Sequence, residues 1–511
     1  MLDVDLFSSR DCPVKYTKSR IYLFAVMAAV MAGLAAAATL AMASYGTDTH
    51  KSQGPDGQSN PTWVRQFGTA NTDGAEGIGQ DAEGNLYVVG YTWSVGADSG
   101  GSAAYDAVVT KFDADGHEIW TTKFGTPDSD YAWNVAVSKE DGLYVLGHTR
   151  GALPGQTHLG SEDVYLRKFD YDGNALWTRQ FGTEFRDEAS DVEVDNQGNV
   201  YVAGITRVAL PGQSKIGNED VYIRKYDSGG NELWTRQFGT TGTDQITNIA
   251  LDGSGHIYVV GPTSGEFPGQ TQSGKYDAFL SQFDVDGNAI WTQQFGTAYT
   301  DSAIDVAADG EGRIYAVGFV RIATRGQRVG VVQNSLMHRF DGDGNGVWSR
   351  EFGTINEDLA TNVAVDGAGD IYVAGRTDGA FPGQVNFGGE DVYVRKFGRD
   401  GQEIWTYQFG SNANDNVRDI MLDGAGNLYL VGLTKGALAG QEHLGLSDAF
   451  LIKLSTGFSP PPAQNVIATE AGSCSGLVTQ IKGRLSIGWI LMGLMLPALT
   501  LAKLISRGSQ G

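Results

Sequence analysis

The sequence predicts an all-β protein, a seven-bladed β-propeller made of four-stranded antiparallel blades. The first observation is a tryptophan that recurs every 57 residues without insertion or deletion, at Trp63, Trp120, Trp177, Trp234, Trp291, Trp348 and Trp405. The second is composition, because 71 glycines against 13 prolines indicate many short strands joined by tight turns. The third is that each repeat holds four short strand-like segments, which is the pattern of one propeller blade.

The four strands of a blade are clearest in the repeat that runs from residue 130 to residue 183. The strands are expected at residues 134–137, 143–147, 163–169 and 175–181. Short turns rich in Asp, Gly and Asn separate the first from the second strand and the third from the fourth. A longer loop, residues 150–162, joins the second strand to the third.

The phase of the repeat predicts how the ring closes. The first unit begins with an isolated fourth strand at residues 62–67, and the last unit ends after a third strand at residues 448–454. Together these two pieces complete one blade. If they pair, the N-terminal strand closes the ring, and the propeller occupies residues 61–456 with no open sheet edge except the outer strands.

The repeated tryptophans are interpreted as structural residues. Each lies on the expected fourth strand, where packing of the ring between neighbouring blades would remove about 150–250 Å² from water. A carbohydrate-stacking role for all seven would deprive the blade interfaces of their largest side chain. The repeated glycine of the second strand, such as Gly147, is interpreted as a site of close backbone approach or positive φ.

The repeat unit resembles the SBBP-type β-propeller repeat of bacterial secreted and surface proteins. The resemblance rests on Asp187-Glu188-Ala189, on residues 194–206, and on residues 220–226 followed by a Gly-Asn turn and Trp234. It covers most of the chain. That family carries no agreed enzymatic activity, so the resemblance implies the fold and leaves the function open.

Charge and cysteine content exclude several classes of function. Sixty acidic against 37 basic residues give a formal net charge of −23, which disfavours nucleic acid and anionic lipid surfaces as partners. The two cysteines, Cys12 and Cys474, lie outside the repeats and form no disulfide framework. The seven histidines are scattered over different repeat positions, so the pattern indicates no zinc site.

The N-terminal residues predict a membrane-inserting segment. A basic stretch, residues 1–20, precedes an uncharged apolar run at residues 21–43, long enough as a helix to cross a hydrocarbon core of about 30 Å. Ala41-Met42-Ala43 fits a signal-peptidase site, whereas the length of the run fits an uncleaved signal anchor, and both interpretations stay open. Residues 44–60 then form a linker to the ring.

A second hydrophobic helix is expected at the other end of the chain. A linker with Pro, Gly and Ser, residues 457–484, precedes an apolar segment at residues 485–506 and a short tail at residues 507–511. The arrangement is similar to the C-terminal sorting tails of bacterial surface proteins, in which Cys474 would be processed or lipidated. Cys474 is otherwise a bystander in the linker. The two ends predict a membrane-anchored, extracytoplasmic ring in the cell envelope.

Two aspartates recur in each repeat at positions expected on one rim of the ring, represented by Asp130, Asp163, Asp187 and Asp220. Paired carboxylates there are candidate Ca²⁺ ligands, but each also suits a backbone cap at a loop end. A second motif, Asp-x-Asp-Gly, begins like a calcium loop and lacks the later Glu, so it favours a structural hairpin turn. No other cofactor is indicated.

Departures from the repeat are the better candidates for function. In the fifth repeat, Arg321, Arg325 and Arg328 stand where other repeats carry Pro-Gly-Gln, and Asn334 replaces an aspartate. This predicts a basic patch for an anionic glycan or an acidic partner, unless it reflects drift after duplication.

Aromatic residues form the second departure. Tyr91, Trp93 and Tyr105 flank a Gly/Ser-rich loop in the first unit, and Trp133 stands where other repeats have small or polar residues. These rings are candidate platforms for a sugar. Trp93 and Trp133 are the two ligand-binding candidates among them.

The sequence contains no motif of a known catalytic nucleophile, metal site or phosphate site, and it therefore predicts no particular catalytic residue. We therefore expect a non-catalytic binding or scaffold module for a protein or polysaccharide of the cell envelope. One alternative is a surface polysaccharide lyase or hydrolase with its active site at the channel mouth. Another is a rigid envelope spacer without a ligand.

Overall fold

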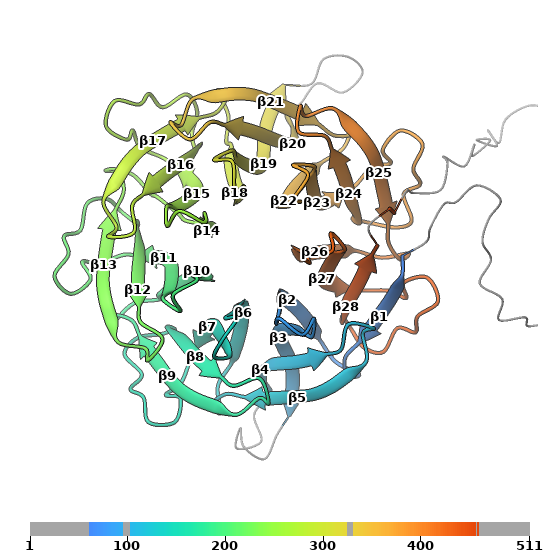
Figure 1. Ribbon diagram of the computed structural model, residues 1–511, viewed down its shortest axis with the longest axis horizontal. Coiled ribbons are helices and arrows are strands. Elements are labelled where there is room, and N and C mark those ends of the chain that lie inside the picture. The colour runs from blue at the N-terminus through green and yellow to red at the C-terminus, as the bar shows by residue number, and fades with distance from the viewer. Residues whose placement is uncertain (1–60, 96–102, 324–330, 456, 459–511) are drawn as a thin grey trace, which may run out of the picture. The chain divides into compact units, whose positions relative to one another are not determined.

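The computed structural model describes residues 61–95, 103–323, 331–455 and 457–458. These residues form strands and turns, without a helix, arranged as seven four-stranded antiparallel sheets around a central axis (Figure 1). The predicted all-β, seven-bladed propeller is therefore confirmed for this part of the chain.

The blades are numbered here in chain order, and each is given from its innermost to its outermost strand. Blades 1 to 3 are β2 (Asp73–Gln80), β3 (Leu86–Val95), β4 (Ala103–Phe112) and β5 (Glu118–Phe124); β6 (Asp130–Val137), β7 (Leu143–Thr149), β8 (Asp163–Phe169) and β9 (Ala175–Phe181); and β10 (Glu188–Val194), β11 (Val200–Thr206), β12 (Asp220–Tyr226) and β13 (Glu232–Phe238). Blades 4 and 5 are β14 (Asn248–Leu251), β15 (Ile257–Thr263), β16 (Asp277–Phe283) and β17 (Ala289–Phe295); and β18 (Ser302–Ala308), β19 (Ile314–Ala323), β20 (Val331–Phe340) and β21 (Gly346–Phe352). Blades 6 and 7 are β22 (Asp358–Val365), β23 (Ile371–Thr377), β24 (Asp391–Phe397) and β25 (Glu403–Phe409); and β26 (Asp415–Leu422), β27 (Leu428–Thr434), β28 (Asp448–Leu454) and β1 (Trp63–Phe67).

The second blade shows how well the strand bounds were predicted. Its third and fourth strands, β8 and β9, match the expected residues at both ends. The innermost strand β6 begins at Asp130, four residues before its expected start. A β-bulge between Ala132 and Asn134 lets this strand continue toward the rim through residues without an apolar pattern. Gly147 pairs with Ala132 beside the bulge, and a Cβ there would lie 1.9 Å from the Tyr131 carbonyl oxygen, so close approach explains the glycine.

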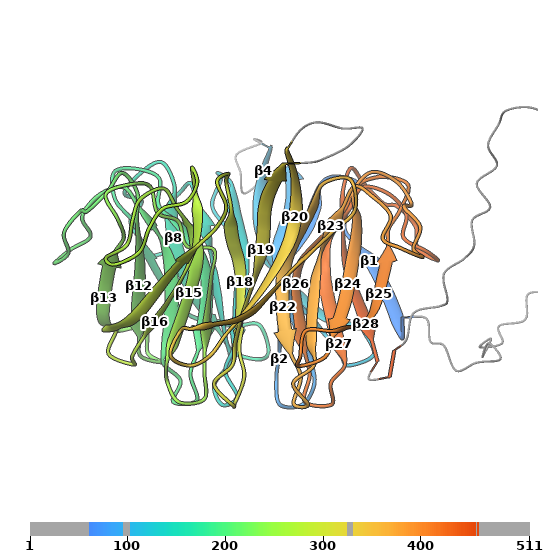
Figure 2. The same ribbon diagram turned by 90° about the horizontal axis from the view of Figure 1, so that it is seen from above.

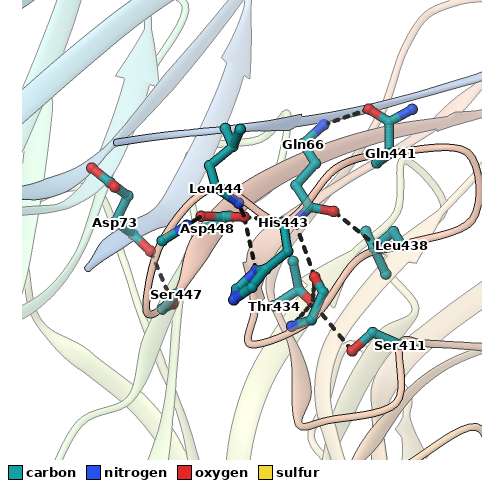
Figure 3. A network of polar contacts seen from close by, with 12 residues as sticks. Gln66, Asp73, Ser411, Thr434, Leu438, Gln441, His443, Leu444, Ser447 and Asp448 are labelled. Atoms are coloured by element: carbon teal, nitrogen blue, oxygen red, sulfur yellow. Dashed lines mark hydrogen bonds and ion pairs between the residues drawn. The ribbon is translucent and has the colours of Figure 1, made fainter. Parts of the chain in front are cut away.

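The ring closes as predicted, by antiparallel pairing of β1 with β28 in a register that runs from Trp63↔Lys453 to Phe67↔Ala449. Side chains reinforce this seam (Figure 3). The Gln66 side chain on β1 donates from Nε2 to Oδ2 of Asp448 at 2.7 Å, and its Oε1 accepts the backbone N–H of Leu438 at 3.0 Å. The N-terminal strand is thus held to blade 7 by both backbone and side-chain hydrogen bonds.

The hydrophobic core is divided into clusters, each between the facing surfaces of two neighbouring blades. The largest fully buried side chains are mostly tyrosines, which lie on the second strand of a blade, such as Tyr87 and Tyr144, or on the third, such as Tyr165 and Tyr222. The repeated tryptophans are only partly buried. Trp120, for example, lies 6.1 Å from the Tyr87 ring, and its Nε1 donates to the Tyr171 carbonyl of the next blade at 3.3 Å. The tryptophans therefore join neighbouring blades, as expected, but tyrosine and not tryptophan fills the deepest positions.

The predicted membrane segments, residues 21–43 and 485–506, lie outside the described residues, as do Cys474 and the linkers beside these segments, except for residues 457–458. Within the part of the chain that the structure describes, no helix has the length and apolar character needed to span a membrane.

Candidate functional site

Five aromatic rings gather on one rim of the ring, above blades 1 and 2. They belong to Tyr91 and Trp93 on β3, Tyr105 on β4, and Tyr131 and Trp133 on β6, and we call them the aromatic cluster. Figure 2 shows the ring from the side, with this end of β4 at the upper rim. All five side chains are partly exposed. The structure therefore brings together the aromatic residues that break the repeat.

The rings pack edge to face and in a stack, which fixes them as one surface. The Trp93 and Tyr105 centroids are 4.7 Å apart, and the Tyr105 and Tyr131 centroids are 5.1 Å apart. Tyr131 and Trp133 are stacked at 5.5 Å with an interplanar angle of 12°. Tyr91 lies 5.3 Å from Tyr105 and 5.4 Å from Tyr131. Such contacts stabilise ring orientations before a ligand binds.

Two rings of the cluster replace an Arg–Glu ion pair that blades 2 and 3 carry at the same rim. Trp93 and Tyr105 stand at the repeat positions of Arg207 and Glu219, which form an ion pair at 2.6 Å in blade 3. The same positions in blade 2 hold a second Arg–Glu pair. Blade 1 therefore exchanges charged side chains, which are strongly hydrated, for rings with apolar faces. This exchange marks the rim of blade 1 as different in chemistry from its neighbours.

A buried carboxylate lies beside the cluster, on the innermost strand of blade 1. Glu76 Oε2 is 3.4 Å from Nε of Arg418 on β26, and Glu76 Oε1 has no hydrogen-bond partner among the described residues. Burial raises the pKa of Glu76 to about 7, while the Arg418 charge opposes the shift. Both charges act on the nearby Tyr91 hydroxyl. A carboxyl group with a pKa near 7 therefore lies beside the aromatic cluster.

Trp133 is held in place by a histidine of the neighbouring strand. Its Nε1 donates to Nδ1 of His148 on β7 at 2.9 Å. Burial lowers the pKa of His148 to about 4, so the imidazole is neutral at pH 7 and has one acceptor nitrogen, which takes either this hydrogen bond at Nδ1 or that of the Ala189 N–H at Nε2, 2.9 Å away. The indole face of Trp133 thus keeps a defined orientation.

The rim aspartates proposed as calcium ligands act as backbone caps. Asp187 Oδ2 accepts the Thr183 N–H at 2.6 Å, and Asp130 accepts the Thr126 N–H in the same way at 2.6 Å. The third-strand aspartates do the same for the preceding loop, since Asp163 accepts the Leu159 N–H at 2.8 Å. Asp220 has the equivalent place in blade 3, where it accepts the Ile216 N–H at 2.8 Å. These contacts match the capping interpretation.

The aspartate at or just before the start of the first strand and the aspartate that begins the third strand lie on one rim, as predicted, and come close together between neighbouring blades. A Cβ placed on Gly182 would lie 2.8 Å from Asp163 Oδ1 and 3.0 Å from Asp187 Oδ2. Among the described residues, however, no group of three or more His, Cys, Asp or Glu side chains has the geometry to hold a metal ion.

The Asp-x-Asp-Gly motifs form hairpin turns. Asp170 Oδ1 accepts the N–H groups of Asp172 at 3.0 Å and Asn174 at 2.8 Å, and Gly173 has φ 85°. This is the structural turn that the missing Glu of a calcium loop indicates.

The predicted basic patch of blade 5 is described only at one of its three residues. Arg321 lies exposed near the end of β19, where its backbone N–H donates to Asp301 at 2.9 Å. Arg325 and Arg328 lie outside the described residues. Asn334, which replaces the rim aspartate, donates to Glu351 at 2.8 Å. Arg321 lies on blade 5, whereas the aromatic cluster lies on blades 1 and 2.

Four residues of the site were not singled out from the sequence: Tyr131, His148, and the paired Glu76 and Arg418. A signal was present, because Glu76, Trp133 and Arg418 share one repeat position, where Ser190 or Thr247 stands in other blades. The predicted ring closure makes the first and last repeats neighbours, but only the structure shows which of their side chains come into contact. The pairing of Glu76 with Arg418 across that seam therefore needs the structure.

A family model described as a beta-propeller repeat, SBBP, matches five segments of the chain: residues 62–96, 176–208, 233–268, 347–382 and 404–438. Each match begins at or near the outermost strand of one blade and continues into the second strand of the next or the loop after it. The unit of sequence is therefore offset by one strand from the unit of structure.

Two curated proteins and two solved structures illustrate the wider likeness. Regulatory protein FlaEY of Caulobacter vibrioides is 27% identical over 370 residues, which cover 63% of this chain and 38% of that protein. The uncharacterized WD repeat-containing protein L264 of Acanthamoeba polyphaga mimivirus is 21% identical over 220 residues, 35% of this chain and 16% of that protein. The chain spans well under half the length of these relatives.

The solved structures share 10–12% identity with the chain. The WD40 domain of Neurospora crassa Pan2 gives a TM-score of 0.45 at 12% identity, covering 78% of this chain and 98% of that chain. Polysaccharide lyase Uly1 gives a TM-score of 0.44 at 10% identity, covering 74% and 89%. The chain is thus a seven-bladed β-propeller in its described residues, and five segments of it match the SBBP beta-propeller repeat.

Proposed function

We propose that this chain is a binding module of the cell envelope, tethered by its terminal apolar segments, that holds a polysaccharide on the aromatic cluster. The observation that carries the proposal is the packing of five aromatic rings on one rim, two of which stand where blades 2 and 3 carry an ion pair. Sugar rings present apolar C–H faces that stack on aromatic faces, and hydroxyl edges that need hydrogen-bonding groups. The aromatic cluster supplies the aromatic faces, and the adjoining Glu76–Arg418 pair supplies the hydrogen-bonding groups.

Replacing Trp133 with alanine is expected to weaken polysaccharide binding at least tenfold, because the change removes the indole face and its stack with Tyr131. About 1.4 kcal/mol of lost contact energy is enough for that factor. Binding is measured on a panel of immobilised envelope polysaccharides with the full-length chain, and recovery of the chain in the membrane fraction tests the tether.

The matched control is Ile304→Ala, since Ile304 has the same repeat position in blade 5 and is also partly buried. This variant should bind like the unmodified protein. Equal binding by Trp133→Ala and the unmodified protein contradicts the assignment of the ligand to the aromatic cluster. Absence of any polysaccharide ligand, with capture of a protein by the same rim, favours a protein partner instead.

A second candidate function is cleavage of the bound polysaccharide, and Glu76 is the observation that favours it. A carboxyl group with a pKa near 7 can both take up and release a proton at neutral pH, as a general acid–base requires. Tyr91 and the partly exposed Arg418 are its neighbours, and a substrate would reach the buried, unpaired Oε1 only after one of the surrounding side chains moves.

Product release from acidic and neutral polysaccharides tests this second function, with reducing ends or unsaturated sugars as the readout. Glu76→Gln is expected to lower the rate of product release at least a hundredfold, because an amide cannot take up and release the proton. Polysaccharide binding should be retained. No release by the unmodified protein from any polysaccharide that it binds contradicts cleavage and leaves the binding function.

A further inference from the structure

A cavity of about 290 Å³ lies between blade 7 and blade 1, on the face of blade 1 that turns toward the closing strand. Its lining includes Phe67 at the end of β1, Thr110 on β4, and Glu118, Thr121 and Lys123 on β5. It shares Tyr91 with the aromatic cluster, and none of the other four rings of the cluster lines it. Two other blade interfaces show which side chain can fill the equivalent position.

In blade 3, an arginine of the chain itself fills the equivalent position. The Arg224 guanidinium carbon lies 4.4 Å from the centroid of the Phe181 ring of blade 2. Its Nε donates to Thr235 Oγ1 at 2.9 Å and lies 3.7 Å from the Glu232 carboxylate. The Thr235 hydroxyl in turn donates to Glu232 at 2.6 Å. A phenylalanine, a threonine and a glutamate thus surround one buried guanidinium.

Blade 6 repeats this arrangement. The Arg395 guanidinium carbon lies 4.5 Å from the centroid of Phe352, and its Nε donates to Thr406 at 2.9 Å. Arg395 also forms an ion pair with Glu403, and Thr406 donates to Glu403 at 2.6 Å. The arrangement is therefore a recurring feature of the repeat and not a chance contact.

Blade 1 keeps three of these four residues and lacks the arginine. Phe67, Glu118 and Thr121 occupy the repeat positions of the phenylalanine, the glutamate and the threonine, and Thr121 donates to Glu118 at 2.9 Å. The position of the arginine holds Thr110, which contacts Thr121 at 3.1 Å. Among the described residues, no cation lies over the Phe67 ring or pairs with Glu118. The binding groups for a guanidinium remain, without the guanidinium.

The cavity is enlarged by a further change. Val108 stands at the position of Tyr222 in blade 3 and Tyr393 in blade 6, so a large ring is missing from the wall. In those blades an apolar loop residue, Leu210 or Phe381, is also buried at this interface.

The glutamine that binds this loop residue is also exchanged in blade 1. Gln237 and Gln408 accept the backbone N–H groups of Leu210 and Phe381 at 2.9 Å and 3.1 Å. Their repeat position in blade 1 is Lys123, which can donate but cannot accept a hydrogen bond. The changes together convert a packed interface into a cavity with an acidic group on one part of its lining and a basic group on another.

We propose that this cavity binds a guanidinium group supplied from outside the chain, either free arginine or an arginine side chain of a peptide. The guanidinium lies over Phe67 and pairs with Glu118, as Arg224 and Arg395 do with their own partners. Lys123 then faces an anionic group of the ligand, such as the α-carboxylate of arginine. The net charge of −23 also favours the approach of a cation.

The test is calorimetric titration of the full-length chain with L-arginine, agmatine and an N-acetylated, C-amidated arginine. Agmatine lacks the carboxylate, and the blocked arginine represents a residue within a peptide, so their ranking distinguishes the two sources. We expect saturable binding of at least one of the three. Glu118→Gln should weaken it at least tenfold, whereas Glu83→Gln, which removes an exposed carboxylate from the same blade, should leave it unchanged.

Thr110→Arg supplies the missing side chain from within and is the decisive variant. It should abolish binding and raise the melting temperature, because it recreates the arrangement of blades 3 and 6. Wild-type affinity in Thr110→Arg or in Glu118→Gln overturns the proposal, as does the absence of binding by all three compounds. None of these variants changes the aromatic cluster, so loss of polysaccharide binding is a separate result.

Discussion

Replacing Asp448 with alanine is expected to lower the free energy of unfolding by roughly 3–4 kcal/mol, because several buried hydrogen-bond donors lose their acceptor at once. Asp448 is fully buried on β28. Its Oδ2 accepts hydrogen bonds from Gln66 Nε2 and from the Leu444 N–H, both at 2.7 Å, and its Oδ1 accepts the Gly445 N–H at 2.9 Å (Figure 3). Gln66 belongs to the closing strand, so the variant also loosens the seam of the ring. Urea unfolding followed by tryptophan fluorescence measures the effect.

Asp284→Ala is the control for this prediction. Asp284 also caps backbone N–H groups, those of Asp286 at 3.0 Å and Asn288 at 2.8 Å, but it lies in an exposed turn of blade 4 where water replaces the lost acceptor. Its unfolding midpoint should change little. Equal shifts in the two variants would show that burial at the seam contributes nothing beyond an ordinary turn.

Most of the architecture was predictable because the repeat has a constant length. A spacing without insertions means that each strand recurs at a known residue, and the incomplete first and last units leave only one way to complete a blade. The innermost strands were predicted too short. Their rim ends, such as Asp130 to Trp133, carry polar and aromatic residues that follow the needs of the rim and show no alternation of apolar residues.

The candidate site was only partly predictable. Trp93 and Trp133 were recognisable as departures from the repeat, because a tryptophan in place of arginine or serine is visible in aligned repeats. The carboxyl group of Glu76 was not, since its raised pKa depends on burial at the seam between blades 1 and 7. The cavity beside Phe67 likewise depends on which blade faces which. The sequence repeats identify equivalent positions in the blades, and the structure shows which side chains of neighbouring blades come into contact.

The innermost strands carry a further pattern that concerns stability. Asp191, Asp305 and Asp419 share one repeat position in blades 3, 5 and 7, where blades 2, 4 and 6 have asparagine. Each aspartate accepts a backbone N–H from the innermost strand of the next blade, those of Ile249 at 2.9 Å, Val363 at 2.7 Å and Ile78 at 2.9 Å. These carboxyl groups therefore link blades around the channel.

Burial raises the pKa of each of these carboxyl groups. It raises the pKa of Asp305 to about 8 and that of Asp419 to about 7, and it holds the pKa of Asp191 well above its usual range. Backbone N–H donors oppose the shifts, and the neighbouring acids add to them for Asp191 and Asp305. Burial also raises the pKa of Glu193, beside Asp191 on β10, to about 7. The folded ring thus binds these protons more tightly than the unfolded chain, in which such groups titrate near pH 4.

The sign of the pH dependence follows from this difference. Below about pH 4 both states are protonated, and the carboxyl groups do not affect the free energy of unfolding. As the pH rises through the range from 4 to 8, the unfolded chain releases protons that the folded ring retains, so the folded state loses stability. We expect the free energy of unfolding to fall by about 3 kcal/mol or more between pH 5 and pH 9, since one unit of pKa difference corresponds to about 1.4 kcal/mol.

Asp305→Asn should flatten this profile, because an amide at this position carries no charge and asparagine already occupies it in three blades. The variant should gain most, relative to the unmodified protein, at pH 9, where the carboxylate is costly, and least at pH 5, where the amide loses one of two acceptor oxygens. Asp284→Asn, in an exposed turn, should keep the unmodified slope. Urea unfolding at a series of pH values measures all three proteins. A profile that stays flat in the unmodified protein, or a slope that survives unchanged in Asp305→Asn, would mean that water in the channel keeps these carboxylates ionised at little cost.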